Sequence, residues 1–243
     1  MLTYGLIGKS LKHSFSKQYF SDKFVKEDIT NTEYLLFELE EVRTVKKLAS
    51  DYPMLSGFNV TIPYKEEIIS LLDMVEQTAK QIGAVNTVKI SNGLWTGYNT
   101  DIIGFEESLK PLLRAQHSNA LILGTGGAGK AIKFVLSQLG IQFKEVSRNP
   151  KDNQLSYAEA AEAAKEHYLI INTTPAGTFP HINEMPPLPL LYIGQKHLVY
   201  DLIYNPAETA LLKKCREKGA QTKNGLEMLQ LQAEKAWQIW QDV

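Results

Sequence analysis

A glycine-rich turn in the middle of the chain limits its fold more than any other feature. Gly124, Gly126 and Gly129 fit the pattern G-x-G-x-x-G. An apolar run over residues 119–124 leads into the turn, and apolar residues at helical spacing follow it over residues 128–139. A strand, a glycine turn and a helix in this order are typical of dinucleotide-binding units, because the helix N-terminus offers N–H groups and a positive dipole end to phosphate.

The glycines of this turn are expected for different reasons, and two other interpretations remain open. Gly124 permits the tight turn, Gly126 lets the backbone approach a pyrophosphate, and Gly129 lets the helix pack against the strand. The spacing from Gly124 to Gly129-Lys130 also fits a P-loop, in which the next residue is Ser or Thr and holds magnesium. Here that residue is Ala131, which disfavours a P-loop. A glycine turn without a ligand is the third interpretation, and the flanking strand and helix disfavour it.

The end of the following strand indicates which dinucleotide would bind. NAD enzymes usually place an acidic residue there, about 20 residues after the glycines, to bind the ribose hydroxyls. In this chain the strand over residues 143–146 is followed by Ser147, Arg148 and Asn149. An arginine can clamp a 2′-phosphate with its planar guanidinium, so the sequence favours NADP(H) over NAD. An exposed loop arginine without a ligand is the alternative.

Alternating strand-like and helix-like runs predict an α/β fold with mostly parallel sheets. We expect strands at residues 4–7, 34–39, 58–60, 87–90, 119–124, 143–146, 168–171 and 198–200. We expect helices at residues 16–26, 41–51, 64–72, 101–113, 128–139, 205–219 and 226–241. Asn205 should cap one of these helices, because Pro206 suits a first helical position and Glu208 completes the cap.

The expected strands and helices form two successive α/β groups, which predict two domains joined across a cleft. The first comprises residues 1–102 together with the returning helix, 226–243, and has a mostly parallel sheet. The second, residues 103–225, is a Rossmann-type domain that carries the glycine turn.

Composition and charge exclude several classes of function. A net charge of −1 leaves no basic surplus for nucleic acid. No apolar run reaches the length of about 18 residues that a transmembrane helix needs, so we expect no membrane partner. The five histidines show no metal-ligand spacing, so we expect no metal. The single cysteine, Cys215, cannot form an intrachain disulfide, which favours a cytoplasmic protein in which this thiol is structural.

Polar residues gather in four segments of the first domain, where strands end or turn. These segments are residues 13–16, 57–65, 83–87 and 97–101. Ligands of open α/β sheets lie beyond the carboxyl ends of the strands, so these segments are candidates for a substrate site. Each one by itself is also compatible with ordinary turn chemistry.

Eight motifs, in matching order, make the chain resemble the shikimate dehydrogenases over nearly its whole length. They are Ser14-x-Ser16, Asn59-Val-Thr61-Ile-Pro-Tyr-Lys65, Gly83-Ala-Val-Asn86-Thr87, Asn99-Thr100-Asp101, Gly124-x-Gly-Gly, Ile171-Asn-Thr-Thr-Pro-x-Gly177, Asp201-x-x-Tyr204-x-Pro206 and Gly225-Leu-x-Met-Leu-x-x-Gln232. The resemblance implies reversible, NADPH-dependent reduction of 3-dehydroshikimate to shikimate in aromatic amino-acid biosynthesis. We expect a monomer or homodimer with this small-molecule substrate.

The resemblance also implies roles for individual residues. The residues that would flank the reacting oxygen are Lys65 and Asp101. Those that would bind the substrate carboxylate or ring hydroxyls are Ser14, Ser16, Thr61, Asn86, Tyr204 and Gln232. Those that would form the pyrophosphate turn are Gly124, Gly126, Gly127, Ala128, Gly129 and Lys130. Those that would hold the adenosine phosphate are Ser147, Arg148 and Asn149, while Leu202 and Gly225 would border the nicotinamide.

The chemistry of ketone reduction agrees with the roles of Lys65 and Asp101 beside the reacting oxygen, and it leaves some alternatives open. Negative charge develops on the ketone oxygen, and a nearby ammonium can stabilise that charge and donate the proton. A neighbouring carboxylate favours the ammonium form, so Lys65 suits an acid better than a base, and the division of protonation roles between Lys65 and Asp101 stays open. Lys65 could instead be a surface helix lysine beside Glu66 and Glu67, and Asp101 a helix cap.

The sequence departs from the family's pattern at two places, and two rival functions remain open. Lys17 follows Ser16 where many members have proline, and Asn149-Pro150 stands where members often have threonine. The nearest rival is a quinate/shikimate dehydrogenase that uses NAD. The other is a non-catalytic dinucleotide-binding protein of the same fold, which the presence of both Lys65 and Asp101 disfavours.

Overall fold

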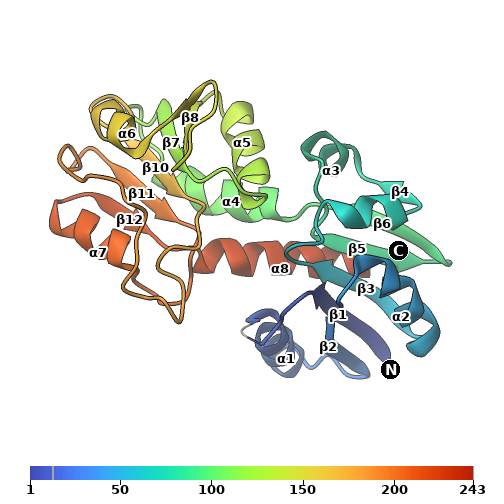
Figure 1. The fold of residues 1–243 in the computed structure, drawn as a ribbon. Coiled ribbons are helices and arrows are strands. Elements are labelled where there is room, and N and C mark those ends of the chain that lie inside the picture. Colours follow the sequence, from blue (N-terminus) through green and yellow to red (C-terminus); the bar gives the residue numbers. More distant parts are fainter. Residues whose placement is uncertain (13, 243) are drawn as a thin grey trace. The chain divides into compact units, whose positions relative to one another are not determined.

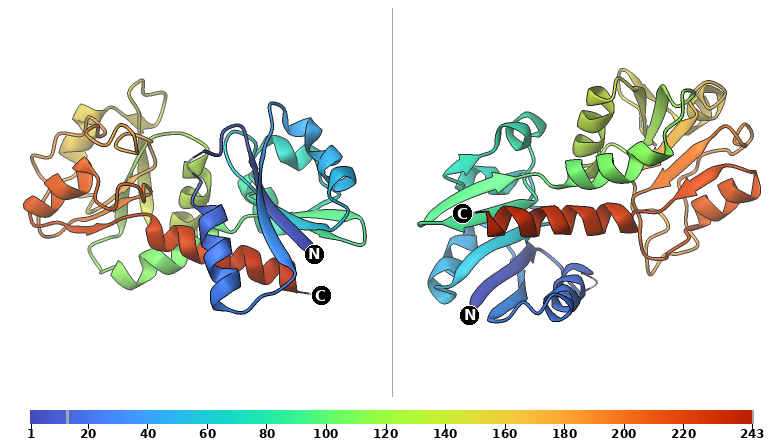
Figure 2. Two further views of the ribbon diagram at one scale, coloured as in Figure 1. Left: turned by 90° about the horizontal axis from the view of Figure 1, so that it is seen from below. Right: turned by 180° about the vertical axis from the view of Figure 1, so that it is seen from behind.

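A computed structural model describes residues 1–12 and 14–242 of the chain, and its contacts divide into two compact units (Figure 1). Unit 1 is Met1–Asp101 together with the residues from Gln232 onward, and unit 2 is Ile102–Leu231. The division falls inside the last helix, α8 (Leu226–Gln241), which is continuous over 16 residues (Figure 2).

Unit 1 is built on a six-stranded sheet in the order β2-β1-β3-β5-β6-β4. Its strands are β1 (Leu2–Gly8), β2 (Thr32–Glu38), β3 (Leu55–Val60), β4 (Met74–Val75), β5 (Thr87–Ser91) and β6 (Leu94–Tyr98). β1 is parallel to β2 and β3, whereas β5 is antiparallel to both β3 and β6. The sheet is therefore mixed.

The antiparallel part of this sheet has a local cause that the sequence analysis missed. Asn92 and Gly93 form the two-residue turn between β5 and β6, with φ of 52° and 78°. Two successive residues with positive φ match the twist of a tight hairpin, and Asn-Gly is the pair that tolerates this conformation best. The hairpin explains why β6 pairs with its immediate predecessor.

The helices of unit 1 agree only in part with the predicted ranges. They are α1 (Ser16–Lys26), α2 (Val45–Asp51) and α3 (Gln77–Ile82), with 3₁₀ helices η1 (Val42–Thr44) and η2 (Glu67–Leu71). The prediction of α1 is confirmed, and the helix expected at 41–51 is split between η1 and α2. The helix expected at 64–72 is wrong over its first three residues, because the Lys65 carbonyl accepts a hydrogen bond from Val85 N (2.7 Å) instead of closing a helical turn.

Aromatic packing fixes α8 on the sheet of unit 1. Tyr4 stacks on Trp240 with ring centroids 4.8 Å apart, and Phe20 of α1 lies 5.6 Å from the same indole. Trp240 Nε1 donates to Val88 O at 2.9 Å. A Cβ at Gly57 would lie 2.4 Å from Trp240 Nε1, so only glycine lets the indole approach β3 this closely.

Unit 2 has a wholly parallel six-stranded sheet in the order β12-β11-β10-β7-β8-β9. Its strands are β7 (Asn119–Leu123), β8 (Gln142–Val146), β9 (Gln154–Leu155), β10 (Leu169–Asn172), β11 (Leu198–Asp201) and β12 (Gln221–Lys223). Its helices are α4 (Asp101–Leu109), α5 (Ala128–Gln138), α6 (Tyr157–Ala163) and α7 (Ala210–Glu217), with the 3₁₀ helix η3 (Lys110–Leu112). The predicted α/β fold is confirmed.

The strand order places the glycine turn at a defined point of this sheet. The chain proceeds from β7 outward to β8 and β9, and then returns to the opposite side of β7 to form β10, β11 and β12. The direction of winding therefore reverses at β7. Ligands of open parallel sheets bind at the carboxyl end of the strands at such a reversal, and the turn after β7 lies there.

The prediction that Asn205 caps the helix after β11 is wrong. The helix, α7, begins at Ala210, and its N-cap is Thr209, whose Oγ1 accepts from Leu212 N at 3.3 Å. The same hydroxyl donates to Asp201 Oδ2 at 2.7 Å, and the Thr209 side chain is fully buried. A tertiary hydrogen bond thus adds to the local capping bond and favours Thr209 over the exposed Asn205.

We therefore expect the substitutions Thr209→Ala and Asn205→Ala to differ sharply. Thr209→Ala should lower the free energy of unfolding by about 1–3 kcal/mol, because it removes a cap and leaves a buried carboxylate short of a donor. Asn205→Ala should change it by less than about 0.5 kcal/mol. Urea denaturation of the two variants checks this, and equal losses would contradict the assignment of the cap.

Candidate active site

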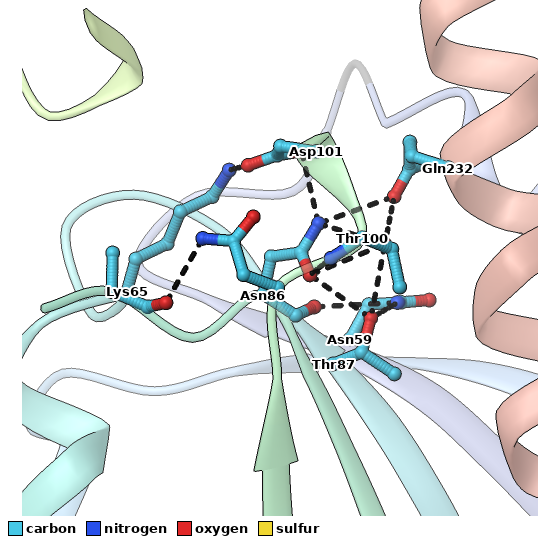
Figure 3. A network of polar contacts seen from close by, with 9 residues as sticks. Asn59, Lys65, Asn86, Thr87, Thr100, Asp101 and Gln232 are labelled. Carbon is cyan, nitrogen blue, oxygen red and sulfur yellow. Dashed lines mark hydrogen bonds and ion pairs between the residues drawn. The ribbon is translucent and has the colours of Figure 1, made fainter. Parts of the chain in front are cut away.

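Polar side chains from four segments of unit 1 form one hydrogen-bonded network (Figure 3). Lys65 follows β3, Asn86 precedes β5, Asp101 opens α4 and Gln232 comes from α8. The contact between Asn86 and Gln232 in this network joins residues that are 146 positions apart in the sequence. The network joins four of the eight residues predicted to be catalytic or substrate-binding.

Lys65 and Asp101 form an ion pair, with Nζ 2.7 Å from Oδ2. The two side chains are 24% and 17% exposed, so the pair is largely shielded from water but remains accessible to a small molecule. Lys65 lies in a turn, which removes the interpretation of a surface helix lysine paired with its sequence neighbours. An ammonium held at such a place can polarise a carbonyl oxygen and supply a proton to it.

The buried Asn86 amide orients this pair. Asn86 Nδ2 donates to Asp101 Oδ1 at 2.9 Å, so the carboxylate is bound through both of its oxygens. Asn86 Oδ1 in turn accepts from Thr100 N at 2.7 Å. Because the amide is fixed on both sides, the Asp101 carboxylate has little freedom to rotate away from Lys65.

Gln232 joins the network from the last helix. Its Oε1 accepts from Thr100 Oγ1 at 3.3 Å and lies 3.5 Å from Asn86 Nδ2. The contact brings a C-terminal side chain next to residues of the N-terminal sheet.

A second line of buried polar groups extends the network toward α1. Asn59 Nδ2 donates to Thr87 Oγ1 at 3.0 Å, and Tyr34 OH donates to Asn59 Oδ1 at 2.8 Å. Burial raises the pKa of Tyr34 well above its ordinary value, and a hydrogen bond with the Ser16 side chain offsets part of this rise. Ser16, predicted to bind substrate, therefore adjoins the end of this line.

Four supporting residues of this network were not predicted as site residues. They are Tyr34, Asn59, Thr87 and Thr100. Asn59, Thr87 and Thr100 stand inside the motifs, and Asn59 also alternates with the apolar residues Phe58 and Val60. Tyr34 has no such sequence signal, because a tyrosine in a strand is typical of an ordinary core position.

Other contacts are found for Ser14 and Thr61 in unit 1. Ser14 lines an open cavity of about 510 Å³ together with Lys12, Lys17 and Glu38, and none of the residues lining it belongs to the Lys65–Asp101 network. Thr61 follows β3, where its backbone N donates to Ile7 O at 3.0 Å.

The glycine turn of unit 2 shows which of its glycines are required by packing. Gly124 has a φ of 103°, and a Cβ there would lie 2.9 Å from Thr174 Cγ2. A Cβ at Gly126 would meet no described atom within 4 Å, so packing within the chain does not explain this glycine. A Cβ at Gly129 would lie 4.0 Å from Thr173 Oγ1, an ordinary contact, so the expected need for close helix packing there is wrong.

The other predicted cofactor residues lie at the same carboxyl edge of this sheet or beyond it. Gly127 is the N-cap of α5, and Ala128, whose side chain is outside the described part of the structure, is its first residue. Lys130 lies in the first turn of this helix. Gly129 N and Lys130 N donate to Gly126 O at 3.0 Å and to Gly127 O at 3.2 Å, so this end suits an anion mainly through the positive end of the helix dipole.

The segment after β8 forms a compact turn. Asn149 N donates to Ser147 Oγ at 3.2 Å, and Ser147 N donates to Leu155 O at 2.9 Å. Arg148 is exposed, and its charge lowers the pKa of Tyr157, which burial raises more strongly. Arg148 therefore stands at the end of β8, at the place where a dinucleotide-binding sheet contacts the adenosine ribose.

Gly225 and Leu202 are packed together. A Cβ at Gly225 would lie 2.0 Å from the Leu202 carbonyl oxygen, so no other residue fits there without moving the backbone. Gly225 N also donates to Ile203 O at 3.0 Å. Tyr204, half-buried, lies in the same loop after β11.

A buried carboxylate, Asp201, ties the loops at this edge together. Its Oδ1 accepts from Asn172 Nδ2 at 2.9 Å and from Ile203 N at 3.1 Å, and its Oδ2 accepts from Thr209. Asn172 Oδ1 accepts from Thr174 N at 3.0 Å, and Thr174 lies against Gly124. Burial raises the pKa of Asp201 to about 6, and these hydrogen bonds offset part of the rise.

Known proteins resemble this chain over almost its full length. The family model described as shikimate dehydrogenase substrate binding domain matches residues 6–88. A shikimate dehydrogenase (NADP(+)) of Methanococcus vannielii is 38% identical over 97% of this chain and 90% of its own.

Solved structures of known proteins are also similar to this chain. The shikimate 5-dehydrogenase of Thermus thermophilus in complex with NADP(H) and shikimate has a TM-score of 0.87 at 30% identity, over 100% of this chain and 94% of that one. A quinate dehydrogenase of Corynebacterium glutamicum in complex with NAD has a TM-score of 0.89 at 26% identity, with the same coverage.

The described residues include no membrane-spanning helix and no cluster of metal ligands. No helix among them is long and apolar enough to span a membrane. Likewise, no group of three or more His, Cys, Asp or Glu side chains in residues 1–12 and 14–242 is arranged to hold a metal ion.

The raised pKa of Asp201 predicts a pH-dependent stability of opposite sign to that of a salt-bridged aspartate. The folded pKa of about 6 exceeds the ordinary 3.8, so the folded state binds the proton more tightly than the unfolded state. The stability from this group is present below about pH 4 and is lost as the pH rises through 6, a change of about 3 kcal/mol. In Asp201→Asn this contribution should vanish. Urea denaturation from pH 4 to 7 measures the free energy of unfolding of the unsubstituted protein and of Asp201→Asn. The same dependence of this free energy on pH in both proteins would contradict the prediction.

Proposed function

The chain belongs to the shikimate dehydrogenase family, and we propose that it catalyses the reversible, NADP-dependent interconversion of 3-dehydroshikimate and shikimate. It is an oxidoreductase that acts on a CH–OH group and uses NADP(H). The observation that carries the assignment of its active site is the Lys65–Asp101 ion pair, oriented by Asn86.

In this proposal unit 1 binds the substrate and unit 2 binds the cofactor. The polar network of unit 1 presents an ammonium, a carboxylate, amides and hydroxyls, which suit a cyclic acid with several hydroxyl groups. A substrate rich in hydroxyl groups needs such partners, because each buried polar group left unpaired costs about 1–3 kcal/mol. Asn86 and Gln232 face the ring hydroxyls. Ser14, Ser16, Thr61 and Tyr204 complete the substrate-binding set.

The residues of unit 2 fit a dinucleotide phosphate. Glycine at Gly126 is unexplained by packing, which is the behaviour expected where the backbone must approach a pyrophosphate. We assign the turn from Gly124 to Lys130 to the pyrophosphate and the segment Ser147–Asn149 to the adenosine 2′-phosphate. Leu202 and Gly225 border the nicotinamide.

The reaction divides between the cofactor and the chain. Bound NADPH supplies the hydride. Lys65 Nζ stabilises the charge that develops on the ketone oxygen and donates the proton to it. Asp101 holds the Lys65 ammonium in place through the ion pair, and Asn86 holds the Asp101 carboxylate. In the oxidative direction the same nitrogen receives the proton from the substrate hydroxyl.

We further propose that the enzyme works in the cytoplasm as a monomer or homodimer. Its only cysteine is buried, and a chain without an intrachain disulfide suits a reducing compartment. Light scattering of the purified protein distinguishes the two assemblies.

The catalytic assignment predicts a loss specific to Lys65. The purified protein should reduce NADP in the presence of shikimate, and Lys65→Ala should lower kcat by about 10²–10⁴-fold, because the proton donor is lost. The matched control is Lys80→Ala, on the exposed face of α3, which should stay within about twofold of the unsubstituted protein. Absorbance of NADPH measures all three. Retention of full activity in Lys65→Ala would remove this lysine from the mechanism.

The cofactor assignment predicts a change confined to NADP. Arg148→Ala should raise the KM for NADP by about 10–100-fold, as expected for one lost hydrogen bond to a charged group, and leave the KM for NAD unchanged. Lys144→Ala, an exposed lysine on β8, is the matched control and should leave both values unchanged. Better use of NAD than of NADP by the unsubstituted protein, or oxidation of quinate at the rate of shikimate, would favour a quinate-type enzyme.

A further inference from the structure

A buried lysine joins the first and last helices of unit 1. Lys23 of α1 has a side chain only 7% exposed, and its Nζ lies 2.7 Å from Glu27 Oε1 and 2.7 Å from Glu234 Oε2. Glu27 lies one turn along the same helix, whereas Glu234 lies on α8, 211 residues away in sequence. Only the second ion pair therefore connects two elements of the fold.

The carboxylate of Glu234 is held at both oxygens. Oε2 accepts from Lys23, and Oε1 accepts from Tyr19 OH, also on α1. Burial raises the pKa of Tyr19, and Glu234 raises it further, so the phenol remains a donor. Burial opposes ionisation of Glu234, but the hydrogen bonds from Lys23 and Tyr19 outweigh it and lower its pKa. The group is therefore an oriented anion with two donors from one helix.

This contact joins the two helices that carry Ser16 and Gln232, both residues of the proposed substrate site. Glu234 is two residues beyond Gln232. Two residues correspond to a rotation of about 200° around the helix axis, so the two side chains point to nearly opposite sides of the helix. Gln232 thus faces the Asn86 network while Glu234 faces α1. α1 begins at Ser16, whose side chain adjoins Tyr34. The contact therefore sets the separation between the start of α1 and the segment of α8 that carries Gln232.

We propose that Glu234 is a positioning residue for substrate binding, which acts by holding Gln232 and Ser16 at a fixed separation. The inference rests on the proposed function of these two residues. A rigid ring with a carboxylate and hydroxyl groups requires its partners at a set distance, and an error of about 1 Å weakens binding severely. Because the Lys65–Asp101 pair has its own support from Asn86, the reaction step itself does not depend on Glu234.

The chain offers a matched pair of substitutions. Glu234→Gln and Glu27→Gln each remove one carboxylate partner of Lys23 and keep the size of the side chain. Only Glu234→Gln breaks the charge contact between α1 and α8. We expect Glu234→Gln to raise the KM for shikimate by about 10-fold, the effect of losing one charged hydrogen bond. Its kcat and its KM for NADP should stay within about twofold, and Glu27→Gln should leave all three within about twofold.

Binding of shikimate without cofactor, measured by calorimetry, separates this inference from the proposed function. Lack of binding by the unsubstituted protein would contradict the proposed function itself. Binding that is equally strong in the unsubstituted protein, Glu234→Gln and Glu27→Gln would overturn the role of Glu234 alone. An equal loss of affinity in the two variants would also overturn it, because it would trace the effect to Lys23 rather than to the contact between helices.

Tyr19→Phe keeps the inference testable should Glu234→Gln fail to fold. It retains the ion pair and removes the second donor to Glu234. We expect a KM for shikimate raised by about two- to fivefold with kcat unchanged, a smaller effect because the lost hydrogen bond leaves the ion pair in place. An unchanged KM in a folded Tyr19→Phe protein would count against the positioning role.

Discussion

The hydrogen bond from the Asn86 amide to the Asp101 carboxylate is the contact on which the candidate active site of unit 1 depends. It leaves one carboxylate oxygen for Lys65 and so fixes where the ammonium can lie. The amide can do this because its own oxygen is held by the backbone at Thr100. Each group therefore limits the next, and the Lys65 ammonium is placed by a chain of neutral and charged hydrogen bonds.

The same chemical pair occurs in unit 2 with a different outcome. Asn172 Nδ2 donates to Asp201 Oδ1 at 2.9 Å, the distance found between Asn86 and Asp101. Asp101 faces an ammonium and is partly exposed, whereas Asp201 is fully buried among neutral donors. The first carboxylate can therefore take part in charge and proton chemistry. The second, with its raised pKa, serves to tie together the loops around the glycine turn.

Local patterns in the sequence predicted much of the fold, and their failures have physical causes. The glycine turn, its strand and its helix follow from spacing alone, because the pattern reports on a backbone requirement. The tight Asn92-Gly93 hairpin was equally local and was overlooked. The cap at Thr209 could not be read locally, since Asn205 has the better local pattern and the buried bond to Asp201 favours Thr209.

Some contacts of the candidate site could likewise be predicted from the sequence, and others could not. Lys65, Asp101 and Asn86 stand in short motifs, so their meeting could be expected from the resemblance. The pairing of Lys23 with Glu234 could not, because a lysine and a glutamate on two amphipathic helices look like solvated residues until the helices are placed together. Tyr34 was missed for a related reason, since its hydroxyl has a partner only after β2 and β3 join the same sheet.

The chain's one thiol gives the molecule a practical property. Cys215 lies in the apolar core of unit 2, and burial raises its pKa to about 12. Alkylating and oxidising reagents act on thiolates, so this sulfur should be inert toward them while the protein is folded. Cysteines introduced on the surface of either unit could therefore carry fluorescent or spin labels selectively, without first removing the native residue.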